Sequence, residues 1–408
     1  MRKRPWAPFT FEGDTLPMDP TCAVFITMNP GYAGRSELPD NLKALFRPVA
    51  MMVPNYAMIA EISLYSYGFQ CARELSEKIT MGLRLASEQL STQAHYDYGM
   101  RAVKSIILAA GRRKAESPDE DEAYLAYRSI AESSVPKLVS EDVPLFMAIL
   151  SDLFPDTERR QPDYTGLLEA LRGACRNRHL ECEEEFSTKA IQLFQTQQVR
   201  HGLMLVGAAL SGKSELMHSL AAALSVLNQD QPVVIEGVNP KAVTIGQLYG
   251  DFDPLTHEWS DGILARIVRE GAADETQRKR WIVLDGPVDA VWVENLNTAL
   301  DDNKKLCLPS GEIIKFTSRM TMIFEVEDLL EASPATVSRC GMVYLTPEKL
   351  GWEVQVQPWL AALPSSLRSE WRGGLLTALI EVLVPPTLAW LLGDGGPARL
   401  IHPGVSAN

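Results

Sequence analysis

The chain has 408 residues, of which 46% are hydrophobic and 22% charged, and its formal net charge is −13. This length allows about two to four domains with ample core. The acidic balance argues against a sequence-independent grip on nucleic acid and against binding to an anionic membrane. The six cysteines include no C-x-x-C pair. No apolar run approaches the roughly 20 residues of a membrane span, so we expect a cytoplasmic protein with reduced thiols.

The first apolar run predicts a strand. Residues 1 to 20 are Pro-rich and look irregular, whereas Cys22 to Met28 is apolar and ends at Asn29 in a turn rich in Gly and Pro. Asn29 has two interpretations that the residues leave open. It either senses a phosphate from the end of a core strand or simply opens the turn.

The pattern then changes from helices to alternating strands and helices. Residues 56–110 predict three amphipathic helices, 111–121 a charged linker, and 122–153 and 165–198 further helices. From residue 202 onward, short apolar runs near 203–206, 233–235, 282–285 and 321–324 predict a parallel α/β sheet. Residues 348–394 read as helical with a break at Pro385-Pro386, and the Gly/Pro-rich end predicts disorder.

The run Gly207-Ala208-Ala209-Leu210-Ser211-Gly212-Lys213-Ser214 fits G-x-x-x-x-G-K-[ST], the loop that surrounds nucleotide phosphates. Gly207 and Gly212 allow backbone angles and close approaches that a Cβ would block. Lys213 is expected to reach the β- and γ-phosphates, and the Ser214 hydroxyl to ligate Mg²⁺. An apolar strand precedes the loop and a helical pattern follows it, which predicts a nucleotide site at a helix N-terminus.

A nucleotide site of this kind also needs an acidic residue at the end of a neighbouring strand to hold the Mg²⁺ shell, and Asp285 suits this role. In ATP-hydrolysing AAA+ proteins a Glu that activates the attacking water usually comes next, but Gly286 stands here. Asp289 and Glu294 are expected to point elsewhere. Glu325 stands where a sensor Asn is common, and a carboxylate there would repel a γ-phosphate. We therefore expect tight ATP binding with slow or no hydrolysis.

Several long runs resemble the AAA+ modules of dynein heavy chains of the axonemal type, over roughly residues 10 to 360. FITMNPGYAGR (Phe25 to Arg35) and ELPDNLKALFRP (Glu37 to Pro48) resemble the first module. The second module is similar to LDGPVDAVWVEN (Leu284 to Asn295), LDDNKKLCL (Leu300 to Leu308) and ASPATVSRCG (Ala332 to Gly341). The resemblance implies P-loop NTPase AAA+ cores, each a parallel sheet with flanking helices, alternating with helical lid subdomains.

Residue roles follow from the resemblance. Asn29 would be the sensor of the first module, Arg47 its finger toward the preceding module, and Arg101 the lid arginine that senses the first module's nucleotide. Arg339 would complete the first module's site in trans, although the residues alone favour a surface salt bridge for it. Gly207, Gly212, Lys213, Ser214 and Asp285 would hold ATP in the second module, with Ser214 and Asp285 at the Mg²⁺.

The resemblance also implies the domain order and the partners. The domains would be 1–62, the end of the first large subdomain; 63–155, its helical lid; 156–347, the second large subdomain; 348–392, a partial lid; and 393–408, a disordered tail. The first module's phosphate loop, later modules, stalk and linker would lie outside this chain. Expected partners are other modules of the dynein ring, intermediate and light chains, and microtubules only through those other parts, in the cytoskeleton and ciliary axoneme.

Two functional interpretations remain open, and they belong to different classes. The first is a motor fragment that binds ATP in its second module. The second is a stand-alone scaffold that binds ATP and a protein partner without turnover. A small-molecule kinase is disfavoured, because no Arg-rich substrate lid is evident in the sequence.

Overall fold

The computed structural model describes residues 7–11, 13–18, 21–27, 39–93, 95–155, 157, 162–253, 255–301, 303–345, 356, 358–360, 363–364 and 370–392. The chain divides into two units, Met1–Val53 and Pro54–Asn408. In the first unit, β1 (Ala7–Phe11) and β2 (Asp14–Met18) form an antiparallel hairpin, and α1 spans Asp40–Lys43. The expectation that residues 1 to 20 are irregular was therefore wrong.

The strand expected from Cys22 to Met28 is not formed over the residues described there. Residues 22–27 have no regular structure, and Phe25 is 91% exposed. A strand needs hydrogen-bonding neighbours, and none of the described residues pairs with this run. Asn29 and Met28 lie outside the described residues.

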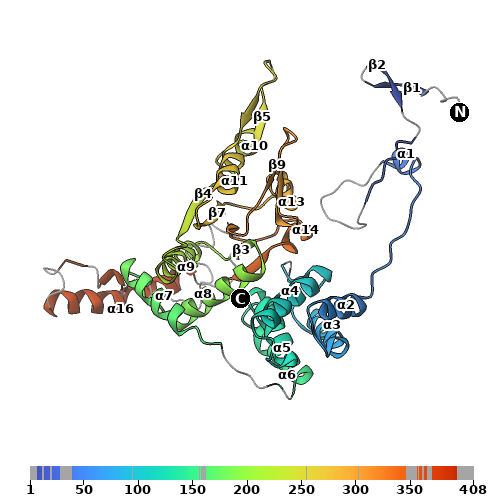
Figure 1. Cartoon of the computed structure of the whole chain (residues 1–408). Helices are drawn as coiled ribbons and strands as arrows, with labels where there is room; N and C mark the ends of the chain where they lie inside the picture. Colours follow the sequence, from blue (N-terminus) through green and yellow to red (C-terminus); the bar gives the residue numbers. More distant parts are fainter. Residues whose placement is uncertain are drawn as a thin grey trace. The chain divides into compact units, whose positions relative to one another are not determined.

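The second unit begins with a helical bundle (Figure 1). Its elements are α2 (Tyr56–Ser66), α3 (Ala72–Gln89), α4 (Met100–Glu116), α5 (Glu122–Ser134), the 3-10 turn η1 (Val135–Lys137) and α6 (Asp142–Leu153). Apolar side chains at helical spacing, such as Leu75, Ile79 and Leu83 of α3, share one core with Ile106, Ile130 and Phe146. The predicted linker at 111–121 is shorter than expected, because α4 runs on to Glu116 and buries Gly111 beneath the Tyr67 ring.

A five-stranded parallel sheet forms the centre of the remaining part. Its strands are β3 (Gly202–Val206), β4 (Val233–Val238), β7 (Lys279–Asp285), β10 (Met320–Val326) and β11 (Gly341–Tyr344), in the order β11-β3-β10-β7-β4. Successive residues point to opposite faces. Leu205 and Ile323 pack with one core cluster, whereas Met204 and Phe324 pack with another. The predicted α/β sheet with flanking helices, of the AAA+ P-loop type, is confirmed.

Helices cover both faces of this sheet (Figure 1). Helices α7 (Thr165–Asn177), α8 (Glu184–Val199) and α9 (Lys213–Leu227) pack on the face that carries Leu205. The other face is covered by α10 (Ile245–Tyr249), α11 (Ile263–Ala273), α12 (Ala290–Val293), the 3-10 turn η2 (Glu294–Leu296), α13 (Asn297–Leu300) and α14 (Pro334–Val337). Two antiparallel hairpins extend from this body, β5 (Gly250–Phe252) with β6 (Trp259–Asp261) and β8 (Lys305–Cys307) with β9 (Ile313–Lys315).

The last described element is α16 (Glu370–Leu392). It runs through Pro385 and Pro386, so the helix break expected there was wrong. None of the helices in the described ranges is both long and apolar enough to cross a bilayer. The expected disordered tail at 393–408 lies outside the described residues. The division into five domains stays a prediction.

Candidate nucleotide-binding site

The phosphate loop follows β3 and leads into α9. Gly212 caps the helix with φ +84°, a left-handed conformation that favours glycine. A Cβ on Gly207 would lie 2.4 Å from the Leu345 carbonyl oxygen, so a larger residue would force the loop away from β11. The Ser211 hydroxyl oxygen is buried and makes no hydrogen bond within the described part of the chain. A tight loop with an orphaned buried hydroxyl fits a phosphate group, which would offer oxygen partners.

The Lys213 side chain folds back onto the phosphate loop. Its Nζ donates hydrogen bonds to the carbonyl oxygens of Gly207 (2.6 Å) and Ala208 (2.8 Å). Burial lowers the pKa of this ammonium, and the carboxylates of Glu325, Glu327 and Asp285 partly oppose that effect. The ammonium is therefore held at the loop and would exchange two carbonyl oxygens for phosphate oxygens when a nucleotide binds.

Three oxygen-bearing side chains meet beside the loop at the carboxyl edge of the sheet. Asp285 ends β7 and lies opposite Glu325 of β10 in the parallel register. The Ser214 Oγ donates a hydrogen bond of 2.6 Å to Glu325 Oε2. Ser214 and Asp285 are exposed, so both can face a Mg²⁺ ion together with phosphate oxygens and water. Among the described residues, no group of three or more His, Cys, Asp or Glu side chains is placed to hold a metal ion.

Glu325 is a buried carboxyl group, 6% exposed, and lies within β10 rather than at its end. Burial raises its pKa, the Ser214 hydroxyl lowers it, and the charge of Asp285 raises it again. From the sequence, we expected Glu325 to lie near a γ-phosphate, at a position where an Asn is common. Its bond to Ser214 was missed, because it depends on how β10 lies between β3 and β7.

The position after Asp285 has no side chain that could activate water. A Cβ on Gly286 would lie 3.3 Å from Asn239 Oδ1, in the turn after β4. Asp289 is already engaged, because its carboxylate accepts from the backbone N–H groups of Val291 and Trp292 and forms an ion pair with Lys241. Asp289 thus caps α12, as N-terminal aspartates commonly do.

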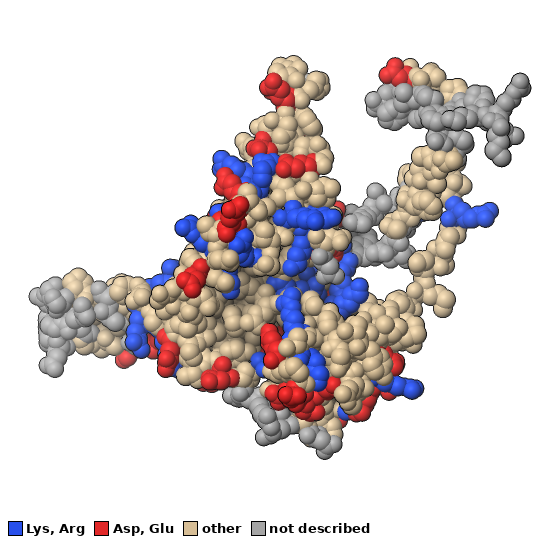
Figure 2. Space-filling model, viewed as in Figure 1, with Lys and Arg blue, Asp and Glu red and all other residues tan. Residues whose placement is uncertain are grey.

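A second cluster of predicted residues lines a cavity of about 590 Å³ between the helical bundle and the sheet. Its walls carry Lys and Arg side chains from both parts: Arg101, Lys104, Arg112, Arg200, Lys304 and Arg339. Figure 2 shows Lys and Arg gathered where the bundle meets the sheet. Asp301 is the one acidic side chain among the lining residues described. The cavity size lies within the usual range for small-molecule pockets.

Arg101 and Arg339 both line this cavity. Arg101 Nη1 donates to Ser338 Oγ at 2.7 Å, although the two residues are 237 positions apart. Arg339 Nε donates to Asp301 Oδ1 at 2.7 Å, and its Nη1 donates to the Ala335 carbonyl oxygen at 2.8 Å. Both arginines therefore meet at one cavity, with Arg339 held by Asp301. Arg47, the other predicted finger, is exposed in the first unit.

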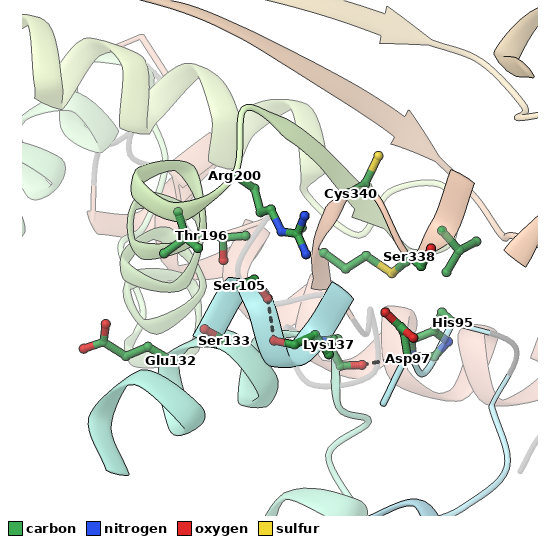
Figure 3. Close-up of a pocket in the computed structure, with 15 residues that line it drawn as sticks. His95, Asp97, Ser105, Glu132, Ser133, Lys137, Thr196, Arg200, Ser338 and Cys340 are labelled. Atoms are coloured by element: carbon green, nitrogen blue, oxygen red, sulfur yellow. Dashed lines mark hydrogen bonds between the residues drawn. The ribbon is translucent and has the colours of Figure 1, made fainter. Parts of the chain in front are cut away.

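A narrower cavity of about 30 Å³ lies next to the basic one (Figure 3). The His95 ring stacks on Tyr344 at 5.3 Å, and His95 Nε2 is hydrogen-bonded to the Lys137 carbonyl oxygen at 2.9 Å. Burial lowers the pKa of the Lys137 ammonium to about 8, with Asp97 opposing and Arg200 adding to that effect. The stack of His95 on Tyr344 joins the bundle to β11.

Two family models match the chain. The model described as the hydrolytic ATP binding site of the dynein motor region matches residues 3–214. The chain belongs to the dynein heavy chain family. The model of the AAA domain of the dynein-related subfamily matches residues 202–340, which contain the phosphate loop and four of the five strands, all but β11.

Individual dynein heavy chains agree with this assignment. Human dynein axonemal heavy chain 1 is 58% identical over 369 residues, 88% of this chain and 9% of the relative. Human dynein axonemal heavy chain 12 is 54% identical over 385 residues, 93% of this chain and 12% of the relative. Mouse dynein axonemal heavy chain 3 is 54% identical over 385 residues, 93% of this chain and 9% of the relative. The chain thus spans about a tenth of the length of these dyneins, and its AAA+ sheet is a dynein nucleotide-binding region.

Proposed function

We propose that the phosphate-loop site binds ATP with Mg²⁺ and hydrolyses it slowly or not at all. The main support for this proposal comes from the residues around Asp285, none of which is placed to act as a general base. Gly286 offers no base, the Asn239 turn packs against it, and Asp289 is engaged by Lys241 and the start of α12. A general base must come within hydrogen-bond reach of the water it activates.

The residues that would hold the nucleotide are those of the loop. Backbone N–H groups of residues 207–214 would surround the phosphates, Lys213 would contact the β- and γ-phosphates, and Ser214 with Asp285 would face the Mg²⁺. Bound Mg²⁺ would neutralise phosphate charge. Glu325 accepts the Ser214 hydroxyl proton, which leaves the lone pairs of the Ser214 oxygen able to face the metal. A charged Glu325 would also repel the γ-phosphate, which further disfavours turnover.

We propose that the basic cavity serves the nucleotide of the preceding module. Arg101 from the bundle and Arg339 from the end of α14 would contact phosphate oxygens there, with Arg339 leaving Asp301 as it does so. The support is the concentration of cations from both sides of one cavity. Asn29, which lies outside the described residues, would be the sensor of that same site, and Arg47 would act toward the module before it.

At the level of the whole protein, we propose a part in microtubule-based ciliary motility. The expected partners are the other AAA+ modules of a dynein ring together with intermediate and light chains, and the expected location is the axoneme of the cilium. The support is the similarity to axonemal heavy chains over most of this chain. Contact with microtubules would be made by other parts of the motor.

Extraction of bound nucleotide tests the phosphate-loop proposal. The purified chain is incubated with Mg²⁺ and ATP, freed of unbound nucleotide, held for hours and then acid-extracted for chromatography. We expect ATP to be recovered in close to equimolar amount, and Lys213→Ala to retain almost none. Recovery of ADP from the unmutated chain in place of ATP would overturn the proposal.

A further inference from the structure

The turn between α13 and β8 carries a lysine in a strained backbone conformation. Lys304 has φ +50°, a left-handed conformation that is unfavourable for a residue with a Cβ. It lies in LDDNKKLCL (Leu300 to Leu308), one of the runs by which the chain resembles dynein heavy chains. Strained residues of this kind persist where the surrounding structure fixes them, and they cluster at binding and active sites.

The backbone of Lys304 is fixed from both sides. The Lys304 N–H donates to the Asp301 carbonyl oxygen at 2.9 Å, and the Phe316 N–H donates to the Lys304 carbonyl oxygen at 2.8 Å. Phe316 is buried in the core cluster that also contains Phe324 of β10. Glycine would adopt the left-handed conformation without steric cost, so the turn itself does not need a lysine.

Asp301 ties Lys304 to Arg339 at the basic cavity. Its carbonyl oxygen accepts from the Lys304 N–H, and its Oδ1 accepts from Arg339 Nε at 2.7 Å. All three residues line the basic cavity, together with Arg101 from the bundle. Lys304 therefore lies at the same cavity as the two arginines for which we propose phosphate contacts.

Lys304 differs from other cations of the cavity in its contacts and burial. Lys104 and Arg112 are exposed on α4, where water solvates their charges. Arg200 donates hydrogen bonds to two backbone carbonyl oxygens. The Lys304 side chain is half-buried and forms no hydrogen bond or ion pair with the described part of the chain. Its ammonium is thus held at the cavity without a counterion, an arrangement that a bound anion would relieve.

We propose that Lys304 is a third cation that contacts the phosphate groups of the preceding module's nucleotide, beside Arg101 and Arg339. This inference rests on the proposed role of the basic cavity. A phosphate oxygen supplies the partner that the ammonium lacks, and the phosphate charge offsets the repulsion among the cations of the cavity. An ammonium on a flexible stem is a compact donor, so it complements the planar forks of the two arginines. The fixed turn keeps this donor at the cavity wall.

Tripolyphosphate binding by the full chain, measured by calorimetry in a Lys213→Ala background, tests this role. Lys304→Ala should weaken binding roughly threefold to tenfold, as loss of one charged donor does. Lys305→Ala is the matched control, because Lys305 is the next residue, begins β8 and does not line the cavity. Both variants lose one positive charge, so an effect of net charge alone would be equal in the two. Equal affinities would overturn the proposal.

Two further substitutions separate the ammonium from the turn. Lys304→Gly lacks the cation but relieves the strain, so it should melt about 1–3 °C above Lys304→Ala and bind tripolyphosphate equally weakly. Lys304→Arg keeps a cation and should bind within about twofold of the parent. Parental affinity in Lys304→Gly would show that position 304 acts through the turn alone, which would contradict a phosphate contact.

The arginine variants distinguish failure of this inference from failure of the cavity proposal. If Arg101→Ala and Arg339→Ala weaken tripolyphosphate binding while Lys304→Ala matches Lys305→Ala, Lys304 is not a phosphate contact and the cavity proposal stands. If neither arginine variant nor Lys304→Ala weakens binding, the cavity does not serve a phosphate group and both proposals fail. We expect all three variants to bind more weakly than Lys305→Ala.

Discussion

The phosphate-loop site and the basic cavity are built from different kinds of contact. The first is assembled from one strand, one loop and one helix that follow each other in the chain, with Asp285 and Glu325 added by strand register. The second is assembled from side chains far apart in sequence, such as Arg101 and Ser338. The first holds a phosphate cradle beside carboxylates, whereas the second holds cations. A nucleotide site that hydrolyses ATP needs both sets, and neither region of this chain holds both. In our proposal the cations of the basic cavity serve the nucleotide of the preceding module.

The largest effect should come from Lys213→Ala at the phosphate loop. Loss of the ammonium removes charge-assisted hydrogen bonds worth about 3 kcal/mol, so Mg²⁺–ATP should bind roughly 100-fold more weakly in calorimetry. Lys279→Ala is the matched control, because Lys279 lies at the opposite end of β7 from Asp285. Equal affinities in the two variants would show that nucleotide binds elsewhere.

A smaller effect, on ATP turnover, is expected when a carboxylate base is placed at Gly286, directly after β7. Gly286→Glu should raise ATP turnover by roughly tenfold over the unmutated chain, below the full 10² to 10⁴ of a well-placed base, because the new side chain crowds Asn239. Gly286→Gln makes the same contacts without a basic carboxylate and should stay at the unmutated rate. If the two variants gave the same rate, the missing carboxylate would not be what limits turnover.

The basic cavity can be tested apart from the phosphate loop in a Lys213→Ala background. There, Arg101→Ala and Arg339→Ala should each weaken tripolyphosphate binding about threefold to tenfold, since each removes one charged donor. Arg84→Ala serves as the control, because Arg84 is exposed on α3 and pairs with Glu88. Asp301→Asn should strengthen binding by releasing Arg339. Unchanged tripolyphosphate binding in both arginine variants would show that the basic cavity does not bind phosphate groups through these side chains.

The smallest expected effect is on how thermal stability depends on pH. Burial raises the pKa of Glu325 in the folded chain above its unfolded value, so the folded state binds more protons between these two values. The Glu325 contribution to stability is therefore fully present below the unfolded pKa and is lost as pH rises through the folded pKa. Glu325→Gln should melt above the unmutated chain at pH 8, with a difference that narrows as the pH falls toward 5. A difference that widened on acidification would contradict this sign.

Local signals in the sequence were enough to predict the phosphate loop together with the strand before it and the helix after it. Gly207 to Ser214 form a continuous motif, and the strand before it and the helix after it have the expected periodicities. Asp285 was predicted because it directly follows an apolar run. The parallel sheet was predicted from the same alternation of strands and helices, and the structure confirms it.

Features that depend on tertiary contacts could not be predicted from the sequence. The Ser214–Glu325 bond requires β10 to lie beside β3, and the Arg101–Ser338 bond requires the bundle to dock near α14. The way α7 ends requires His179 in a left-handed conformation, which a residue other than glycine does not signal in the sequence. The apolar run at 22–27 was misread for the opposite reason, because a good local strand pattern has no pairing partner in the described chain.

Steady-state ATP turnover by the unmutated chain, beside Lys213→Ala, tests the central claim most directly. The account predicts that the unmutated chain binds Mg²⁺–ATP through Lys213 but turns it over no faster than the variant does. Robust turnover that disappears in Lys213→Ala would contradict it, and would mean that a carboxylate such as Asp289 or Glu294 replaces the base that Gly286 lacks.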